Sequence, residues 1–127
     1  MSIFTIEQIE NRLNEIQGTL IAPYEFDNGH IIMSRLNDLA AYMAESGKLK
    51  ADAEYHLLSK TQTQVIKALK DLLPEYASAK MQNDLIKGLV AKEQSLVTFA
   101  DRVNRSCVHQ IDVMRTQLSY LKELSKF

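Results

Sequence analysis

The chain of 127 residues is poor in the residues that interrupt helices. It contains four glycines, two prolines, one cysteine and no tryptophan. Glycine and proline are the two residues that destabilise a helix interior most, so their scarcity favours an all-α protein with long helices. The one cysteine, Cys107, excludes an intramolecular disulfide and a zinc site built from several cysteines.

Long apolar runs are also missing from the chain. No stretch approaches the roughly 18 to 20 apolar residues that a helix needs to span a bilayer. The N-terminus, Met-Ser-Ile-Phe-Thr, has no basic segment of the kind that begins a signal peptide. We therefore expect no membrane partner and a location in the reducing cytoplasm.

Positive and negative charges nearly balance, which gives a net charge of −1. It is unevenly spread: residues 1–47 carry seven acids and two arginines, whereas 48–90 carry seven lysines and five acids. Ordinary solvated helix faces explain this pattern, and a head-to-tail attraction between subunits is the alternative.

The most regular feature of the chain lies near its C-terminus. Apolar residues there recur at alternating steps of three and four, as on a helix that packs lengthwise against another helix. A helix over 91–125 would be about 50 Å long. The members of this predicted oligomer seam are Val97, Ala100, Asn104, Cys107, Ile111, Met114, Leu118 and Leu121.

The N-terminal third predicts a helix and a loop. Thr5 and Gln8 form a capping-box pattern before a helix over 5–20. In the loop over 21–29, Pro23 blocks the helix and Asn28-Gly29 favours positive φ. Two aromatic residues of this loop, Tyr24 and Phe26, are expected to plug the core end of a helical pair.

The middle of the chain predicts two helices, over 30–46 and 49–73, which Gly47 separates as a C′ residue. Pro74 ends the second helix. The inward positions expected in the first are Ile32, Leu36, Leu39, Ala40 and Met43. Those expected in the second are Ala51, Tyr55, Leu58, Gln62, Val65, Leu69 and Leu72.

A last helix is expected over 75–126, with Gly88 as the position of a kink or break. The fold class is therefore all-α: one domain over 1–127, a bundle or hairpin of four to five helices with a long, coiled-coil-like C-terminal helix. Since this helix is longer than the one over 49–73, the uncovered seam favours a homo-oligomer, with a dimer preferred. The alternative is an antiparallel hairpin within one chain, which uses the same spacing.

The oligomer seam contains one amide, Asn104, and the inward positions of the helix over 49–73 contain another, Gln62. A buried amide costs stability unless it is hydrogen-bonded, and its best-attested role is to set register or oligomer state. We expect Asn104 to pair with itself across a two-fold axis or with Gln62 of a neighbouring helix. The alternative is that one or both amides lie at the solvent-exposed rim.

Residue patterns typical of catalytic or metal-binding sites are sparse in this chain. Cys107 and His109 stand two positions apart, so they point about 200° apart on a helix and form no nucleophile–base pair. Nucleophile motifs, phosphate-binding glycine loops, Glu-x-x-His and His-x-x-x-His are absent. We expect no enzyme, catalytic residues, metal or cofactor.

A basic face on the last helix indicates a different class of function. Arg102, Arg105, His109 and Lys122 are expected to share this face, although acidic residues interrupt it and no aromatic residues alternate with them for base stacking. Contacts of these four residues with nucleic acid are the alternative function.

Three segments, Ala51–Tyr55, Ala100–Arg105 and Val108–Ser119, resemble small helical accessory proteins of unknown function encoded by phages, prophages and other mobile elements, notably of the Bacteroides group. The resemblance covers roughly residues 36–122. It implies an accessory protein from a replication, recombination or host-takeover region, in the host cytoplasm if phage-encoded. We expect a non-enzymatic protein that self-associates and binds a protein partner such as a host factor.

Overall fold

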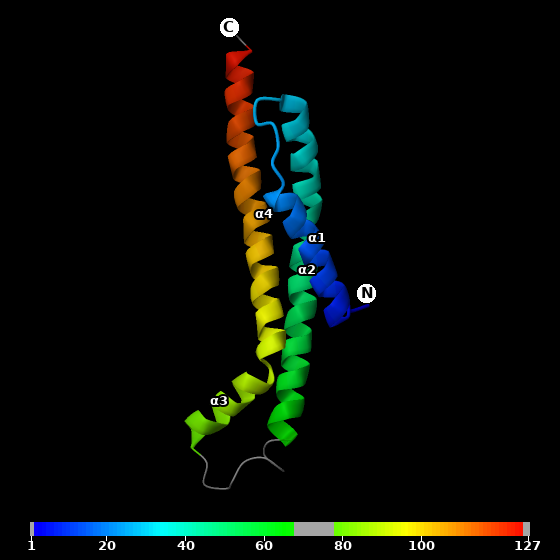
Figure 1. Ribbon diagram of the computed structural model, residues 1–127, viewed down its shortest axis with the longest axis vertical. Helices are drawn as coiled ribbons and strands as arrows, with labels where there is room; N and C mark the ends of the chain where they lie inside the picture. Colours follow the sequence, from blue (N-terminus) through cyan, green and yellow to red (C-terminus); the bar gives the residue numbers. More distant parts are fainter. Residues whose placement is uncertain (1, 68–77, 126–127) are drawn as a thin grey trace.

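The computed structural model describes residues 2–67 and 78–125 (Figure 1). This part of the chain is helical and contains no strand. The predicted all-α bundle with a long C-terminal helix is therefore confirmed. The helices are α1 (Ile6–Ile21), α2 (Gly29–Lys67), α3 (Ala79–Leu89) and α4 (Ala91–Leu124).

The two longest helices, α2 and α4, run antiparallel and lie side by side over most of their length (Figure 1). Helix α1 packs along one side of this pair, and α3 turns away at the lower end. Apolar side chains from the three long elements meet in one core. Its fully buried members are Ile9, Leu13, Ile16, Ile32, Leu39, Leu49, Ala53, Ala100, Cys107 and Met114.

Both ends of α1 are capped, and the expected helix over 5–20 is confirmed. Thr5 and Gln8 form the predicted capping box, with Gln8 N–H donating to Thr5 Oγ1 at 3.1 Å. At the other end the Arg35 guanidinium donates to the carbonyl oxygens of Thr19 and Ala22. Helix α2 thereby supplies a hydrogen-bond donor to carbonyl groups at the C-terminal end of α1 and at its C-cap residue, Ala22.

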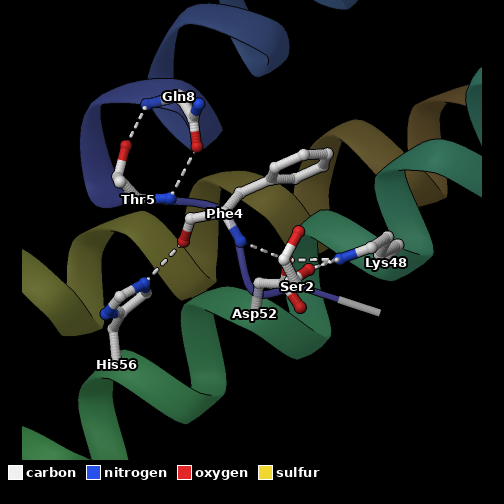
Figure 2. Close-up of polar contacts among 7 residues, drawn as sticks. All are labelled: Ser2, Phe4, Thr5, Gln8, Lys48, Asp52 and His56. Atoms are coloured by element: carbon white, nitrogen blue, oxygen red, sulfur yellow. Dashed lines mark hydrogen bonds and ion pairs between the residues drawn. The ribbon is translucent and has the colours of Figure 1, made fainter.

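The N-terminal segment is bound to the middle of α2 through polar contacts (Figure 2). Asp52 Oδ2 accepts hydrogen bonds from Phe4 N–H at 2.9 Å and Lys48 Nζ at 2.6 Å. His56 Nε2 donates to the Phe4 carbonyl at 2.7 Å. Burial of Asp52 by itself would raise its pKa, but the hydrogen bonds from Lys48 and Phe4 outweigh it and lower the pKa.

A bidentate ion pair fixes α1 further along α2. Arg12 donates to both carboxylate oxygens of Glu45, at 2.6 and 2.7 Å. This pair and the N-terminal contacts hold α1 on one side of the α2–α4 pair. The opposite side of the pair therefore stays open to solvent within the described part of the chain.

The predicted break at Gly47 is wrong, because 30–46 and the described part of 49–73 form the single helix α2. No described residue has positive φ, the conformation that a C′ glycine takes. A glycine costs a helix interior only about 1 kcal/mol. Burial of Leu39 and Leu49 on either side of Gly47 outweighs that cost. Leu69, Leu72 and the predicted end at Pro74 lie outside the described residues.

The last predicted helix divides at Val90, two residues after Gly88. Val90 has φ −112° and ψ 15°, and its N–H donates to the Ile86 carbonyl, which ends α3. Its side chain is buried, so a core position and not the glycine sets the corner. The beginning of α3 is capped by Ser78, whose Oγ accepts from Met81 N–H.

The loop before α2 differs from the prediction in two ways. Asn28 caps α2, since its Oδ1 accepts from the N–H groups of His30 and Ile31 at 3.0 and 3.3 Å, and Asn28-Gly29 forms no positive-φ turn. Tyr24 packs against the core as expected, and its hydroxyl donates to Gln117 at 2.9 Å. Phe26 is 67% exposed, so the core role expected for it is wrong.

Candidate protein-interaction surface

The predicted oligomer seam on α4 is covered inside the chain. Ala100, Cys107, Ile111 and Met114 are buried, and Val97, Asn104, Leu118 and Leu121 are half-buried against the same core or beside it. Helix α2 has 39 residues and α4 has 34, so α2 is long enough to cover this seam. The antiparallel hairpin is the correct alternative, and the argument for a dimer from uncovered seam length is wrong.

Asn104 has its partners on α2 of the same chain. Its Nδ2 donates to the Met43 carbonyl and to Ser46 Oγ, both at 3.0 Å. Gln62 is exposed on another face of α2. The predicted pairing of Asn104 with itself or with Gln62 is therefore wrong, because the hairpin brings Ser46 opposite Asn104.

Cys107 and His109 point apart, as predicted. The Cys107 side chain is buried in the core, and burial raises the pKa of its thiol. His109 is exposed on the far side of α4. A buried thiol with a raised pKa is a weak nucleophile, so the structure brings these two residues into no common site.

The four basic residues predicted to contact nucleic acid are all exposed but do not share one face. Lys122 follows Arg102 by 20 residues, about five and a half turns, which places it on roughly the opposite side of α4. Arg105 Nε pairs with Asp101 at 3.0 Å, which offsets its charge. His109 stays on the side of Arg102 and Arg105.

Several lysines in the middle of the chain are also engaged in ion pairs within it. Lys48 pairs with Asp52, Lys60 with Glu93 and Lys50 with Asp101 at 3.1 Å. Their charges stabilise the bundle and are offset locally. A continuous basic surface over α2 and α4 therefore does not form.

The side of α2 that faces away from α1 carries a second apolar stripe, which we call the outward stripe. Its largest side chains are well exposed: Met33 by 46%, Tyr55 by 52% and Leu58 by 59%. The prediction that Ala51, Tyr55, Leu58 and Gln62 point inward is wrong, since all four are exposed. The same prediction for Met43, with Ala40 beside it, is also wrong, since both are exposed. The outward stripe consists of Met33, Ala40, Met43, Ala44, Gly47, Ala51, Tyr55 and Leu58, and half-buried Leu36, which packs against the core, lies at its edge.

The stripe that does face α4 recurs at steps of seven residues along α2. It contains Ile32, Leu39, Ser46, Ala53 and Lys60. Two of its members are polar, but each meets a polar residue of α4: Ser46 binds Asn104, and Lys60 pairs with Glu93. Ile32 and Leu39 were predicted to point inward and are buried, whereas Ser46, Ala53 and Lys60 were missed. The sequence did indicate that α2 carries apolar residues on two neighbouring stripes, of which only one could face α4.

A groove of about 360 Å³ lies between α2 and α4 beside the N-terminal half of the outward stripe. It opens on the side of the pair opposite α1. Its floor is apolar and its rim carries Asp112 and Arg115. The lining residues are Leu36, Asn37, Ala40, Met43, Val108, Ile111, Asp112 and Arg115.

The charges that flank this open face are balanced. Lys50 pairs with Glu54 and Asp101, and Arg105 also pairs with Asp101. Asp112 and Arg115, one charge of each sign, line the groove. Such a surface suits a protein partner better than a polyanion, which requires a basic excess.

No family model, curated protein or solved structure matches the chain. Within residues 2–67 and 78–125, no helix is long and apolar enough to cross a membrane. The same residues contain no group of three or more histidine, cysteine, aspartate and glutamate side chains placed to hold a metal ion. The open face is the candidate functional site because it combines exposed apolar side chains with a groove between α2 and α4.

Proposed function

We propose that this protein is a non-enzymatic, cytoplasmic interaction protein that binds another protein chain through the outward stripe. The observation that carries the proposal is that α2 has two apolar stripes, of which the described residues cover only one. A helix of a three-helix bundle needs one apolar stripe to reach its core. A second stripe indicates a second partner.

Burial energetics support this assignment. Full burial of a leucine or methionine side chain contributes about 1.5–3 kcal/mol of stabilisation. Because Leu58 and Met33 are about half exposed, about half of that stabilisation is still to be gained when a partner covers them. An apolar patch with a polar rim is typical of protein interfaces. The free thiol of Cys107 accords with a reducing compartment.

The resemblance to accessory proteins of phages and mobile elements suggests the kind of partner. The partner that the resemblance suggests is a host protein. Self-association is a second use of the same stripe, and a copy bound there excludes the host protein. Both uses require the apolar side chains of α2 and neither requires a catalytic group.

The test compares two single-charge variants in affinity capture from host lysate. Leu58→Glu places a charge on the outward stripe, whereas Asn14→Glu places the same charge on the exposed side of α1, away from the stripe. Proteins that the wild type and Asn14→Glu capture, and Leu58→Glu does not, support the proposal. Identical captured proteins from all three would overturn it, provided that both variants show wild-type circular dichroism.

The nucleic-acid alternative has its own measurement. Binding to single- and double-stranded DNA is measured at low and high salt for the wild type and for Arg102→Glu/Arg105→Glu. We expect no binding that depends on these arginines. Salt-sensitive binding that the double variant loses would replace the proposed function with nucleic-acid binding.

A further inference from the structure

Two hollows adjoin each other on α4, on the opposite side from the open face. The first, of about 690 Å³, lies at the corner where α3 turns away from α4 (Figure 1). The second, of about 330 Å³, lies between α4 and the C-terminal end of α1. Ser95, Thr98 and Arg102 line both hollows, which therefore form one depression that we call the corner pocket. Its size is that of small-molecule sites, roughly 300–1,000 Å³.

The end of the corner pocket nearest α3 carries positive charge without a counter-charge. Lys87 of α3 and Arg102 of α4 line it, and no described aspartate or glutamate lines either hollow. Neither cation has an ion pair or hydrogen bond with a side chain of residues 2–67 or 78–125. Cations that share a concave surface raise the local concentration of anions.

Uncharged donors stand beside the two cations. Gln94 and Ser95 line the same hollow, and within the described part of the chain their side chains have no hydrogen-bond partner. The guanidinium of Arg102 can donate two parallel N–H groups to the oxygens of one phosphate or carboxylate. This end of the corner pocket therefore has the chemistry of an anion site.

The other end of the corner pocket is apolar. Leu20 and Ile21 of α1 line it together with Phe99 and Val103 of α4. Ile21 is 75% exposed, more than Leu58 of the outward stripe. Because burial of such a side chain is favourable, an apolar group seated against Ile21 would gain affinity.

We propose that the corner pocket binds a small organic anion. Its phosphate or carboxylate group lies at Lys87 and Arg102, and its apolar body lies against Phe99 and Ile21. This inference goes beyond the proposed function and is independent of it, since the outward stripe contributes no residue to the corner pocket.

A small ligand fits this site better than a long polyanion does. The next hollow between α1 and α4 contains Glu10 beside Lys92, one charge of each sign. Arg105, one turn after Asp101, is paired with that carboxylate. Positive charge therefore does not continue beyond the corner pocket, whereas a nucleic acid requires cations along several phosphates.

Fluorescence titration with two related dyes tests the inference. Anilinonaphthalene sulfonate carries an anionic group on an apolar body, and phenylnaphthylamine is the same body without that group. Arg102→Gln should weaken binding of the anionic dye at least about tenfold and leave binding of the neutral dye unchanged, because only the anion loses a charged hydrogen bond. Ile21→Ser should weaken binding of both dyes.

Matched variants control for charge and for the open face. Arg115→Gln removes the same charge from α4 outside the corner pocket, and Leu58→Glu alters the outward stripe. Both should bind the anionic dye as the wild type does. Octyl phosphate should displace the dye from the wild type, whereas a short DNA duplex or phosphatidylglycerol vesicles at equal phosphate concentration should not.

Each other outcome overturns the inference. Dye binding that depends on Leu58 and not on Arg102 would place the dye on the outward stripe. Equal losses for Arg102→Gln and Arg115→Gln would mean general attraction between charges. Displacement by DNA or vesicles and not by octyl phosphate would replace the small ligand with a polyanion or a lipid surface. Lysate capture through Leu58 is measured separately, so either proposal can fail while the other stands.

Discussion

Lys60 of α2 and Glu93 of α4 form an ion pair at the end of the core nearest α3. Lys60 Nζ lies 2.6 and 3.2 Å from the two carboxylate oxygens of Glu93, whose residue is only 2% exposed. Glu93 lies in the first turn of α4, where the helix dipole favours a negative charge. The pair explains how a carboxylate can occupy a core position of α4.

Removing Lys60 alone should lower the free energy of unfolding more than removing both Lys60 and Glu93. Lys60→Met leaves Glu93 buried without a partner and should lower the free energy of unfolding by about 2–4 kcal/mol. Lys60→Met/Glu93→Leu should recover most of this loss, because the core then contains no unpaired charge. Urea denaturation measures both, with Lys80→Met on exposed α3 as the control. A double variant no more stable than Lys60→Met would contradict the prediction.

Asn104 should stabilise the hairpin through its contacts with α2. Asn104→Leu removes the hydrogen bonds to the Met43 carbonyl and Ser46 Oγ and should lower the free energy of unfolding by about 0.5–1.5 kcal/mol. Asn14→Leu, on the exposed side of α1, is the matched control. A stability gain for Asn104→Leu would restore the idea that this amide sets assembly at the expense of stability.

The N-terminal contacts should depend on pH through Asp52. Because the pKa of Asp52 is lower in the folded chain than its ordinary value of 3.8, its carboxylate stabilises the fold above that value. This contribution is lost as the pH falls below 3.8. Asp52→Asn should lower the free energy of unfolding by about 1–2 kcal/mol at pH 7.

The pH profile separates this effect from general acid denaturation. Between about pH 5 and 3, the stability of Asp52→Asn should fall less steeply than that of the wild type. Asp38→Asn removes one exposed negative charge from the same helix and is the control. Equal slopes for Asp52→Asn and the wild type would show that Asp52 contributes nothing to the pH dependence.

Two helix-interior glycines should be replaceable. Gly18 has no atom within 4 Å of a built Cβ, and Gly47 has only Asn104 Nδ2 at 4.0 Å. Since neither has positive φ, Gly18→Ala and Gly47→Ala should each raise the free energy of unfolding by about 0.5–1 kcal/mol. Thermal and urea unfolding measure this. A loss for Gly47→Ala alone would indicate that Asn104 does not accommodate the added methyl group.

Cys107 should be inert in the folded protein. Its side chain is fully buried and burial raises the pKa of the thiol, so thiol reagents should label it at least about 100-fold more slowly than in 6 M urea. Cys107→Ser should lower the free energy of unfolding by about 1–3 kcal/mol, because it buries a hydroxyl. Rapid labelling of the native protein would contradict the buried position.

Local features could be predicted from the sequence because few neighbouring residues determine them. The Thr5–Gln8 capping box acts within one turn and begins α1 as expected. The spacing from Val97 to Leu121 correctly indicated a helix packed lengthwise. It could not indicate whether the packing partner was α2 of the same chain or another copy, since both use one spacing.

Features that depend on a second helix could not be predicted in this way. Gly47 is a plausible helix end by itself, but burial of Leu39 and Leu49 against α4 keeps α2 continuous. Several members of the outward stripe, such as Met43, Tyr55 and Leu58, were predicted to point inward because they are apolar. Their exposure depends on how α2 packs on α4, where half-exposed Lys60 reaches the buried carboxylate of Glu93.

The sequence by itself determined the all-α class, the capped beginning of α1 and the presence of apolar stripes at helical spacing. Tertiary structure alone decided which stripe of α2 faces the core and which stays exposed. The physical reason is that a buried polar group is tolerated only with a partner. Buried Ser46 of α2 binds Asn104, and buried Glu93 of α4 pairs with Lys60, and both partners are distant in the sequence. That pairing turns Tyr55 and Leu58 outward, where they form the proposed binding surface.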